Sequence, residues 1–192
     1  MSDHARSAGV LGSMVWGSER LGRTITRYRE FHLGADVASI SALTGLTASD
    51  VKTIHAGPAL LQVLEWPEPY AASRDGAAEG VQRITFRFYN DQLFRLVIRH
   101  HRDRSDTTIE AHIKRISGMY GQAMKPLLTV PRAPVGAVGA DVTARLATWN
   151  DGHHTAVLYG PSRGSGFRIV VTSVRLEQLA RTAGADALRW TD

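Results

Sequence analysis

The sequence predicts an α+β protein in which helices pack on one face of an antiparallel sheet. Amphipathic helical patterns that end at a glycine alternate with short strand-like segments and turn residues, which is typical of this class. The pattern also occurs twice: a helix ending at Gly45 or Gly121 precedes a strand ending at Trp66 or Trp149. The similar segments FRLVI (94–98) and FRIVV (167–171) then follow. We therefore expect two related helix-β-β-β units.

Composition restricts the class of protein to which the chain can belong. Its 192 residues are 43% hydrophobic and 21% charged, the balance of an ordinary globular protein. The 23 Lys and Arg exceed the 18 Asp and Glu to give a net charge of +5, which weakly favours anionic partners. Because cysteine is absent, disulfides, thiolate metal sites and cysteine nucleophiles are excluded.

Three segments organise the chain. Residues 1–23 read as a mobile leader, residues 24–106 as the first helix-hairpin and β-meander unit, and residues 107–192 as the second unit with a C-terminal helix. The apolar window 8–16 is interrupted by glycine and is too short for a clear export signal, and no window reaches the length of a membrane span. These features do not identify the cellular compartment.

The stretch DVASISALTGLTASDVKTIH, residues 36–55, is the sharpest motif of the chain. Asp36 caps a helix ending at Gly45, and Thr47 with Asp50 forms a capping box for a second helix that ends at Gly57-Pro58. The spacing fits a DNA-reading helix-turn-helix, but the second helix offers only Lys52 and His55 to DNA. We favour a helical hairpin that seals the sheet through Ile40, Leu43, Val51 and Ile54.

Residues 60–66 and 81–101 supply the strands of the first unit, separated by a loop over 67–80. The register of the hairpin follows from its turn. A three-residue loop, Tyr89-Asn90-Asp91, with Asp91 left-handed, places one set of apolar side chains on a single face: Ile84, Phe86, Phe88, Phe94, Leu96 and Ile98.

The second unit begins with a T-x-x-E capping box formed by Thr107 and Glu110. Its helix runs to Gly121 on a stripe of Ile109, Ile113, Ile116 and Tyr120, which predicts that Tyr120 is buried. A connector over 122–141 leads to strand-like segments 142–149, 154–160 and 167–173. Ser173 then caps a final helix with one apolar side, formed by Leu176, Leu179, Ala180 and Ala183.

The opposite face of the predicted hairpin is basic. The same register gathers four arginines on it, and we expect that face to be left to water because the apolar face must meet the helices. Guanidinium groups pair well with carboxylates, so a protein with an acidic surface is the expected partner. The candidate partner-binding residues are Arg83, Arg87, Arg95 and Arg99.

The other polar clusters lack the spacing of a metal, cofactor or catalytic site. In HHRDRSDTTIEAH (100–112), His100 and His101 alternate across a strand, and His112 falls on a different helix face from Glu110. The glycine-rich loop GPSRGSG (160–166) joins two strands, so no helix N-terminus backs a phosphate there. No serine has a nucleophile-elbow context. We expect no metal, no cofactor and no enzymatic activity.

Residues 25–175 carry a family resemblance, on the segments REFHLGADVASISALTGL, HAGPALLQVLEW and FYNDQLFRLVIRHHRDR and a helix ending in MYG. This pattern resembles a group of uncharacterised bacterial proteins. More loosely, the doubled helix-loop-helix and strand arrangement is similar to the tandem units of β-lactamase inhibitor proteins and of small outer-membrane assembly lipoproteins. The resemblance implies a protein-binding role in the envelope or outside the cell.

The resulting hypothesis is a non-enzymatic binding or envelope-associated module whose partner is unknown. It docks acidic surfaces on the arginine-rich sheet face. The alternative is a nucleic-acid-binding protein that uses the helix-turn-helix at 36–56.

Overall fold

The computed structural model describes residues 25–67, 69, 80–101, 108–124, 144–160 and 166–184. The predicted leader and most of the predicted 67–80 loop and 122–141 connector lie outside these ranges. The elements in chain order are β1 (Arg27–Tyr28), β2 (Phe31–His32), α1 (Val37–Thr44), the short 3-10 helix η1 (Ala48–Asp50), β3 (Lys52–Ala56), β4 (Leu60–Pro67), β5 (Val81–Tyr89), β6 (Gln92–His100), α3 (Ile109–Tyr120), β7 (Arg145–Asn150), β8 (His154–Tyr159), β9 (Arg168–Ser173) and α4 (Val174–Ala183).

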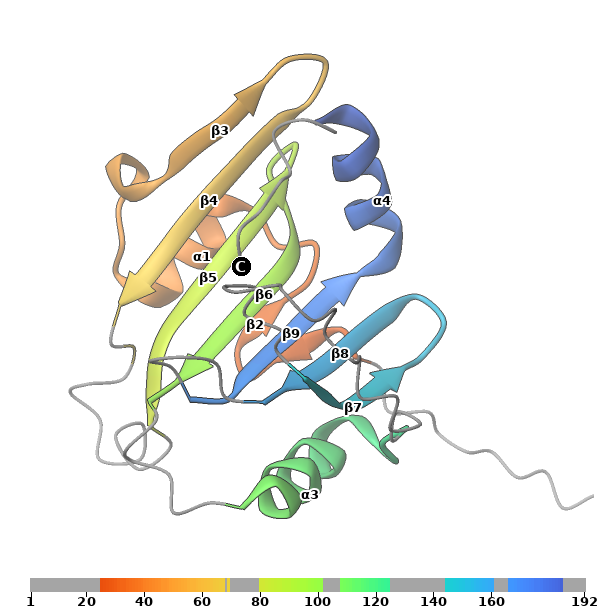
Figure 1. The fold of residues 1–192 in the computed structure, drawn as a ribbon. Coiled ribbons are helices and arrows are strands. Elements are labelled where there is room, and N and C mark those ends of the chain that lie inside the picture. The colour runs from red at the N-terminus through yellow and green to blue at the C-terminus, as the bar shows by residue number, and fades with distance from the viewer. Residues whose placement is uncertain are drawn as a thin grey trace, which may run out of the picture.

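The α+β prediction is confirmed. Seven antiparallel strands form one sheet in the order β3-β4-β5-β6-β9-β8-β7, and β1 and β2 form a separate two-stranded hairpin (Figure 1). The two predicted units therefore share one sheet, which is joined where β6 pairs with β9. No helix within the described ranges is long and apolar enough to cross a membrane.

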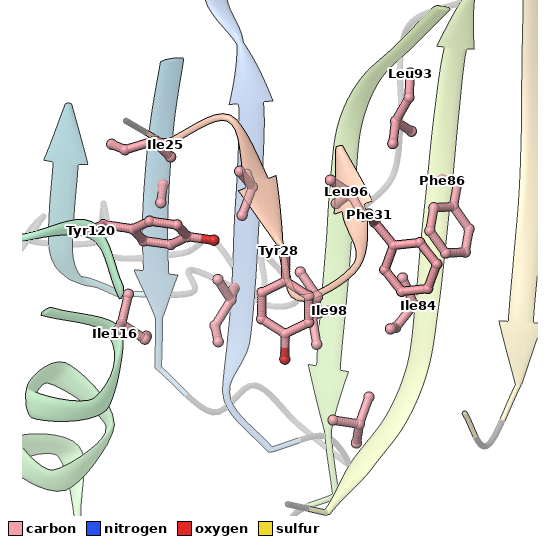
Figure 2. Close-up of a cluster of buried hydrophobic side chains, with 14 of the residues drawn as sticks. Ile25, Tyr28, Phe31, Ile84, Phe86, Leu93, Leu96, Ile98, Ile116 and Tyr120 are labelled. Atoms are coloured by element: carbon pink, nitrogen blue, oxygen red, sulfur yellow. The ribbon is translucent and has the colours of Figure 1, made fainter. Parts of the chain in front are cut away.

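One face of the sheet carries the main core. The β1–β2 hairpin and α3 pack against this face, with Tyr28, Phe31, Ile116 and Tyr120 meeting the strand side chains (Figure 2). Phe31 contacts Phe86 edge-to-face, with ring centroids 4.9 Å apart. Tyr120 is buried, as its helical stripe predicted, whereas Ile109 at the start of the same stripe is 38% exposed.

Helix α4 lies on the opposite face, contrary to the expectation that all helices share one face. Ala180 packs against Leu61 and Phe94 in a second, smaller cluster. Leu176 packs against that cluster, but Leu179, which was predicted on the same apolar side, is 40% exposed. Two helical residues three positions apart lie on neighbouring but not identical faces, and only one of these two reaches the sheet.

The turn between β5 and β6 differs from the predicted loop. Asn90 and Asp91 have φ of 45° and 64°, and Tyr89 pairs with Gln92, so the turn has two residues. Two consecutive left-handed residues form the turn whose twist suits a hairpin, and Asn and Asp tolerate that conformation. The left-handed Asp91 was predicted correctly, while the three-residue loop was wrong.

A β-bulge restores the predicted face, though not the predicted pairs, beyond the turn. The pairing shifts between Arg87 and Phe88, after which Phe86 faces Leu96 and Ile84 faces Ile98, so even positions again oppose even ones. The extra residue reverses the alternation locally, so Phe94 points to the α4 side instead of the main core. The backbone of Leu93 bonds instead to the segment before α1, which explains the shift: its N–H donates to the Ala35 carbonyl (2.8 Å) and its carbonyl accepts from Gly34 (2.7 Å).

The predicted second helix of the 36–56 motif does not form. Asp36 caps α1, and Thr47 with Asp50 makes the expected capping box, but only η1 follows. Residues Lys52–Ala56 extend as strand β3 at the border of the sheet. Thr53 and Ile54 are β-branched and favour strands, and pairing with β4 outweighs the local helix signal. Leu43 and Ile54 are 50% and 38% exposed, so neither seals the sheet as predicted.

The second half has the predicted strands and a helix that begins one residue later than expected. The N-cap of α3 is Thr108, whose hydroxyl accepts from the Ala111 amide at 3.2 Å, and not Thr107. The β7–β8 turn is organised by Asp151, whose carboxylate accepts from the Ile25 amide (2.8 Å) and the His154 amide (2.7 Å). Partial burial raises the pKa of Asp151, but these amide bonds outweigh it and hold the pKa below its usual value.

Candidate functional site

The four predicted arginines do share one sheet face. Arg83 lies directly opposite Arg99, and Arg87 lies opposite Arg95, in the β5–β6 ladder. Each pair is thus a cross-strand contact between like charges, which destabilises a sheet unless neighbouring groups compensate. The two pairs differ in their surroundings, and that difference decides which of them is available to a ligand.

Arg87 and Arg95 are not left to water, so the expectation of an open four-arginine face is wrong for them. Arg87 is only 7% exposed. The Arg95 side chain is 12% exposed and its guanidinium lies 3.2 Å from the Glu177 carboxylate of α4. Helix α4 could not be placed on this face from the hairpin sequence, because its contact with β6 joins residues 82 positions apart.

Arg83 and Arg99 lie further from α4 and belong to a longer series. The paired positions continue from Arg99 to Arg168 on β9, from Arg168 to Tyr159 on β8, and from Tyr159 to Arg145 on β7. Five adjacent strands therefore each contribute one residue to a single line perpendicular to the strands. We call this line the basic row: Arg83, Arg99, Arg168, Tyr159 and Arg145.

The basic row is accessible to different degrees along its length. Its two ends are exposed: the Arg83 side chain is 46% accessible, and Arg145 lies on the border strand β7. Arg99, Arg168 and Tyr159 are half-buried, and the Nε atom of Arg168 is fully buried. The row is therefore most accessible at its two ends, Arg83 and Arg145.

Charge compensation along the row is incomplete. Arg83 is 3.5 Å from Glu65, a pair exposed enough for water to weaken it. Within the described ranges, Arg99 and Arg145 form no ion pair. The guanidinium carbon of Arg168 lies 4.7 Å from the centre of the Tyr159 ring, a cation–π contact that orients the guanidinium.

Three of the five members, Arg168, Tyr159 and Arg145, were missed by the sequence analysis. Arg168 occupies in FRIVV the place of Arg95 in FRLVI, and Arg145 lies in the predicted strand 142–149. Pairing the two similar segments in antiparallel fashion would have placed Arg168 beside Arg99. The sequence does not show whether the two units form one sheet, so the pairing of Arg168 with Arg99 could not be predicted.

A second polar feature is a histidine pair inside the core. The rings of His100 and His112 are edge-to-face with centroids 5.6 Å apart, and the two residues are 1% and 2% exposed. The Phe167 ring also packs against His112, with ring centroids 4.4 Å apart. Burial, with a smaller contribution from the positive charge of Arg115, lowers the pKa of His112 to about 4.

The structure describes only part of the other polar segments, 100–112 and 160–166. Asp103, Asp106 and most of the 160–166 loop lie outside the described residues. Within those residues, no group of three or more His, Asp or Glu side chains is arranged to hold a metal ion. His100 and His112 are nevertheless brought together, which the alternation argument did not anticipate because it could not place α3 against β6.

Comparisons with protein-family models, with curated proteins and with solved structures find no match for this chain. The family resemblance drawn from the sequence therefore stays a prediction.

Proposed function

We propose that this chain is a non-enzymatic binding module that docks an acidic partner on the basic row. The observation that supports it is the row itself: four arginines and one tyrosine at equivalent positions of five adjacent strands. Guanidinium groups stay charged at every physiological pH and donate paired hydrogen bonds, so such a row suits carboxylate binding rather than proton transfer.

Repulsion within the row favours an anionic ligand. Arg99 is flanked across the ladder by Arg83 on one side and Arg168 on the other. Like charges directly opposite each other on neighbouring strands cost free energy. A carboxylate that bridges two guanidiniums removes part of this cost, which adds a contribution to binding beyond the direct contact.

We also infer that the two units are related and that the row depends on their union. The segments FRLVI and FRIVV pair so that Leu96 faces Val171, Val97 faces Val170 and Ile98 faces Ile169. If residue 94 corresponds to residue 167, this register is the one that a two-fold axis between Val97 and Val170 requires. Arg83 and Arg99 come from the first unit and the other members from the second, so neither unit alone has the whole row.

The test uses fluorescein-labelled poly-L-glutamate as the probe and fluorescence anisotropy as the readout. Wild-type protein is compared with Arg99→Glu/Arg145→Glu, which reverses two charges of the row, and with Lys52→Glu/Lys114→Glu, which makes the same charge change at exposed positions elsewhere. We expect the row variant to bind at least tenfold more weakly and the control to change less than threefold, with the difference shrinking in high salt.

Equal losses in the two variants would show that net charge alone attracts the probe, and would contradict the proposal. So would a wild-type protein that does not bind. Arg145→Glu is measured alone as well, because a substitution at an exposed position on a border strand should leave the fold intact. Far-UV circular dichroism and the thermal midpoint of each variant verify the fold.

A further inference from the structure

We infer that the partner presents a flexible, extended acidic segment of six or more residues to the basic row, rather than a rigid acidic surface. The inference rests on the proposed function and specifies the chemistry and shape of the partner. It follows from three properties of the row: its twist, its single aromatic ring and its length.

The twist of the sheet turns the members of the row away from one another. Adjacent strands rotate by roughly 20–25°, so the four steps from Arg83 on β5 to Arg145 on β7 add up to about 80–100°. The change of strand direction across the sheet can be followed in Figure 1. At this average twist, the two ends of the row point in nearly perpendicular directions.

A rigid partner cannot follow such a turn. A flat protein surface or a straight helix meets two or three neighbouring members and leaves the others to water. A chain without fixed structure can bend around the sheet and bring a carboxylate to each guanidinium in succession. Ordering that chain costs conformational entropy, so such binding is weak for each contact and gains strength from the number of contacts.

The aromatic content of the row favours carboxylates over the bases of a single-stranded nucleic acid. Proteins that bind single strands without sequence preference stack successive bases on exposed aromatic rings. Tyr159 is the row's single ring, and the guanidinium of Arg168 lies over it at 4.7 Å from the ring centre. One face of that ring is already occupied, so the row combines four guanidiniums with little stacking surface.

The length of the row sets the length of the segment. Strands lie about 4.8 Å apart, so four steps span roughly 19 Å. An extended chain advances about 3.3 Å per residue, and about six residues cover that distance. Affinity should rise steeply with length up to six residues and slowly beyond.

The experiment measures the affinity of labelled peptides for wild-type protein, Arg145→Glu and the control Lys114→Glu. One series contains three, six and twelve glutamates. A second pair contains six glutamates in twelve residues, either alternating with glycine or placed on one face of an alanine-rich helix. A twelve-nucleotide oligothymidylate is the nucleic-acid probe.

We expect at least a tenfold gain in wild-type affinity from three to six glutamates and less than threefold from six to twelve. The glycine-containing peptide should bind at least fivefold more tightly than the helical one. Arg145→Glu should remove most of the gain from three to six glutamates, because it reverses the charge at one end of the row. Lys114→Glu, an exposed position on α3, should keep the gain.

Different failures separate the two proposals. If the helical peptide binds as tightly as the flexible one, or if Arg145→Glu keeps the full gain with length, the flexible-segment inference is wrong while docking of acidic partners stands. Tighter binding of the oligothymidylate than of twelve glutamates, weakened by Arg145→Glu, would assign the row to nucleic acid and overturn the inference. If no acidic peptide binds, the proposed function fails with it.

Discussion

At the scale of single residues, His112 makes folding sensitive to acid. Its folded pKa of about 4 lies below the ordinary value of 6.5, because burial and, to a lesser degree, Arg115 disfavour the charged ring. The unfolded chain therefore takes up a proton first as the pH falls, so stability is lost between about pH 6.5 and pH 4 and is fully present above that window.

We expect wild-type protein to lose about 2 kcal/mol more stability than His112→Leu when the pH is lowered from 7 to 5. Urea unfolding at each pH gives both values. His32→Gln, at an exposed position on β2, serves as the control and should keep the wild-type pH dependence. The same slope in wild type and His112→Leu would refute this assignment.

Tyr120 joins α3 to the N-terminal hairpin in two ways that mutation can separate. Its ring is buried in the main core, and its hydroxyl donates to the Arg27 carbonyl at 2.8 Å. Tyr120→Ala should cost on the order of 3 kcal/mol or more, while Tyr120→Phe, which loses only the hydrogen bond, should cost about 1 kcal/mol. Urea midpoints measure both, with Met119→Ala on the exposed side of α3 as the control. A midpoint for Tyr120→Ala equal to that of wild type would contradict the packing.

At the scale of elements, the β5–β6 turn is tied to α1. The Asp91 carboxylate accepts from the Val37 amide at 2.9 Å, at the first residue of that helix, while its own φ is left-handed. Asp91→Ala loses the bond and places a poorly suited residue at a left-handed position, whereas Asp91→Gly loses the bond alone. We expect the alanine variant to be about 1 kcal/mol less stable than the glycine variant in thermal or urea unfolding. If the glycine variant is the less stable one, the turn conformation is not the deciding factor.

Sequence patterns predicted elements well wherever local signals decide them. Gly45 and Gly121 end helices where the pattern placed them, and β4, β5 and β6 cover the expected strands. The N-cap of α3 was misplaced by one residue, but the larger failures depend on distant contacts. Residues 52–56 extend because β4 pairs with them, and the register near the turn shifts because Leu93 bonds to the segment before α1.

The candidate site, too, was predictable where local pairing decides it and not where distant segments meet. The placement of Arg83 and Arg99 on one face was predictable, because it needs only one hairpin. The covering of Arg95 by α4 and the approach of Arg168 to Arg99 were not, because each joins segments about 70 or more positions apart. Alternation within a strand says which residues share a face, but not which helix or strand lies beside that face.

At the scale of the whole molecule, the shared sheet predicts one cooperative unfolding unit. β6 and β9 pair over five residues, and the main core includes side chains from both predicted units. Trp66 lies in the first and Trp149 in the second, so two single-tryptophan proteins report on each unit separately. In each protein, tryptophan fluorescence and far-UV circular dichroism should give the same urea midpoint. A first unit that unfolds at a different urea concentration from the second would show two independent domains.

The join between β6 and β9 also has a consequence for synthesis on the ribosome. Leu96 pairs with Val171, 75 residues later, so β6 has only β5 as a neighbour until β9 has emerged. At a translation rate of about 5–20 residues per second, that interval lasts roughly 4–15 s. During it, the backbone groups of an apolar strand remain open to pairing with another nascent chain. The charges of Arg95 and Arg99, carried on that same strand, then oppose the approach of an identical strand before they have any role in the finished protein.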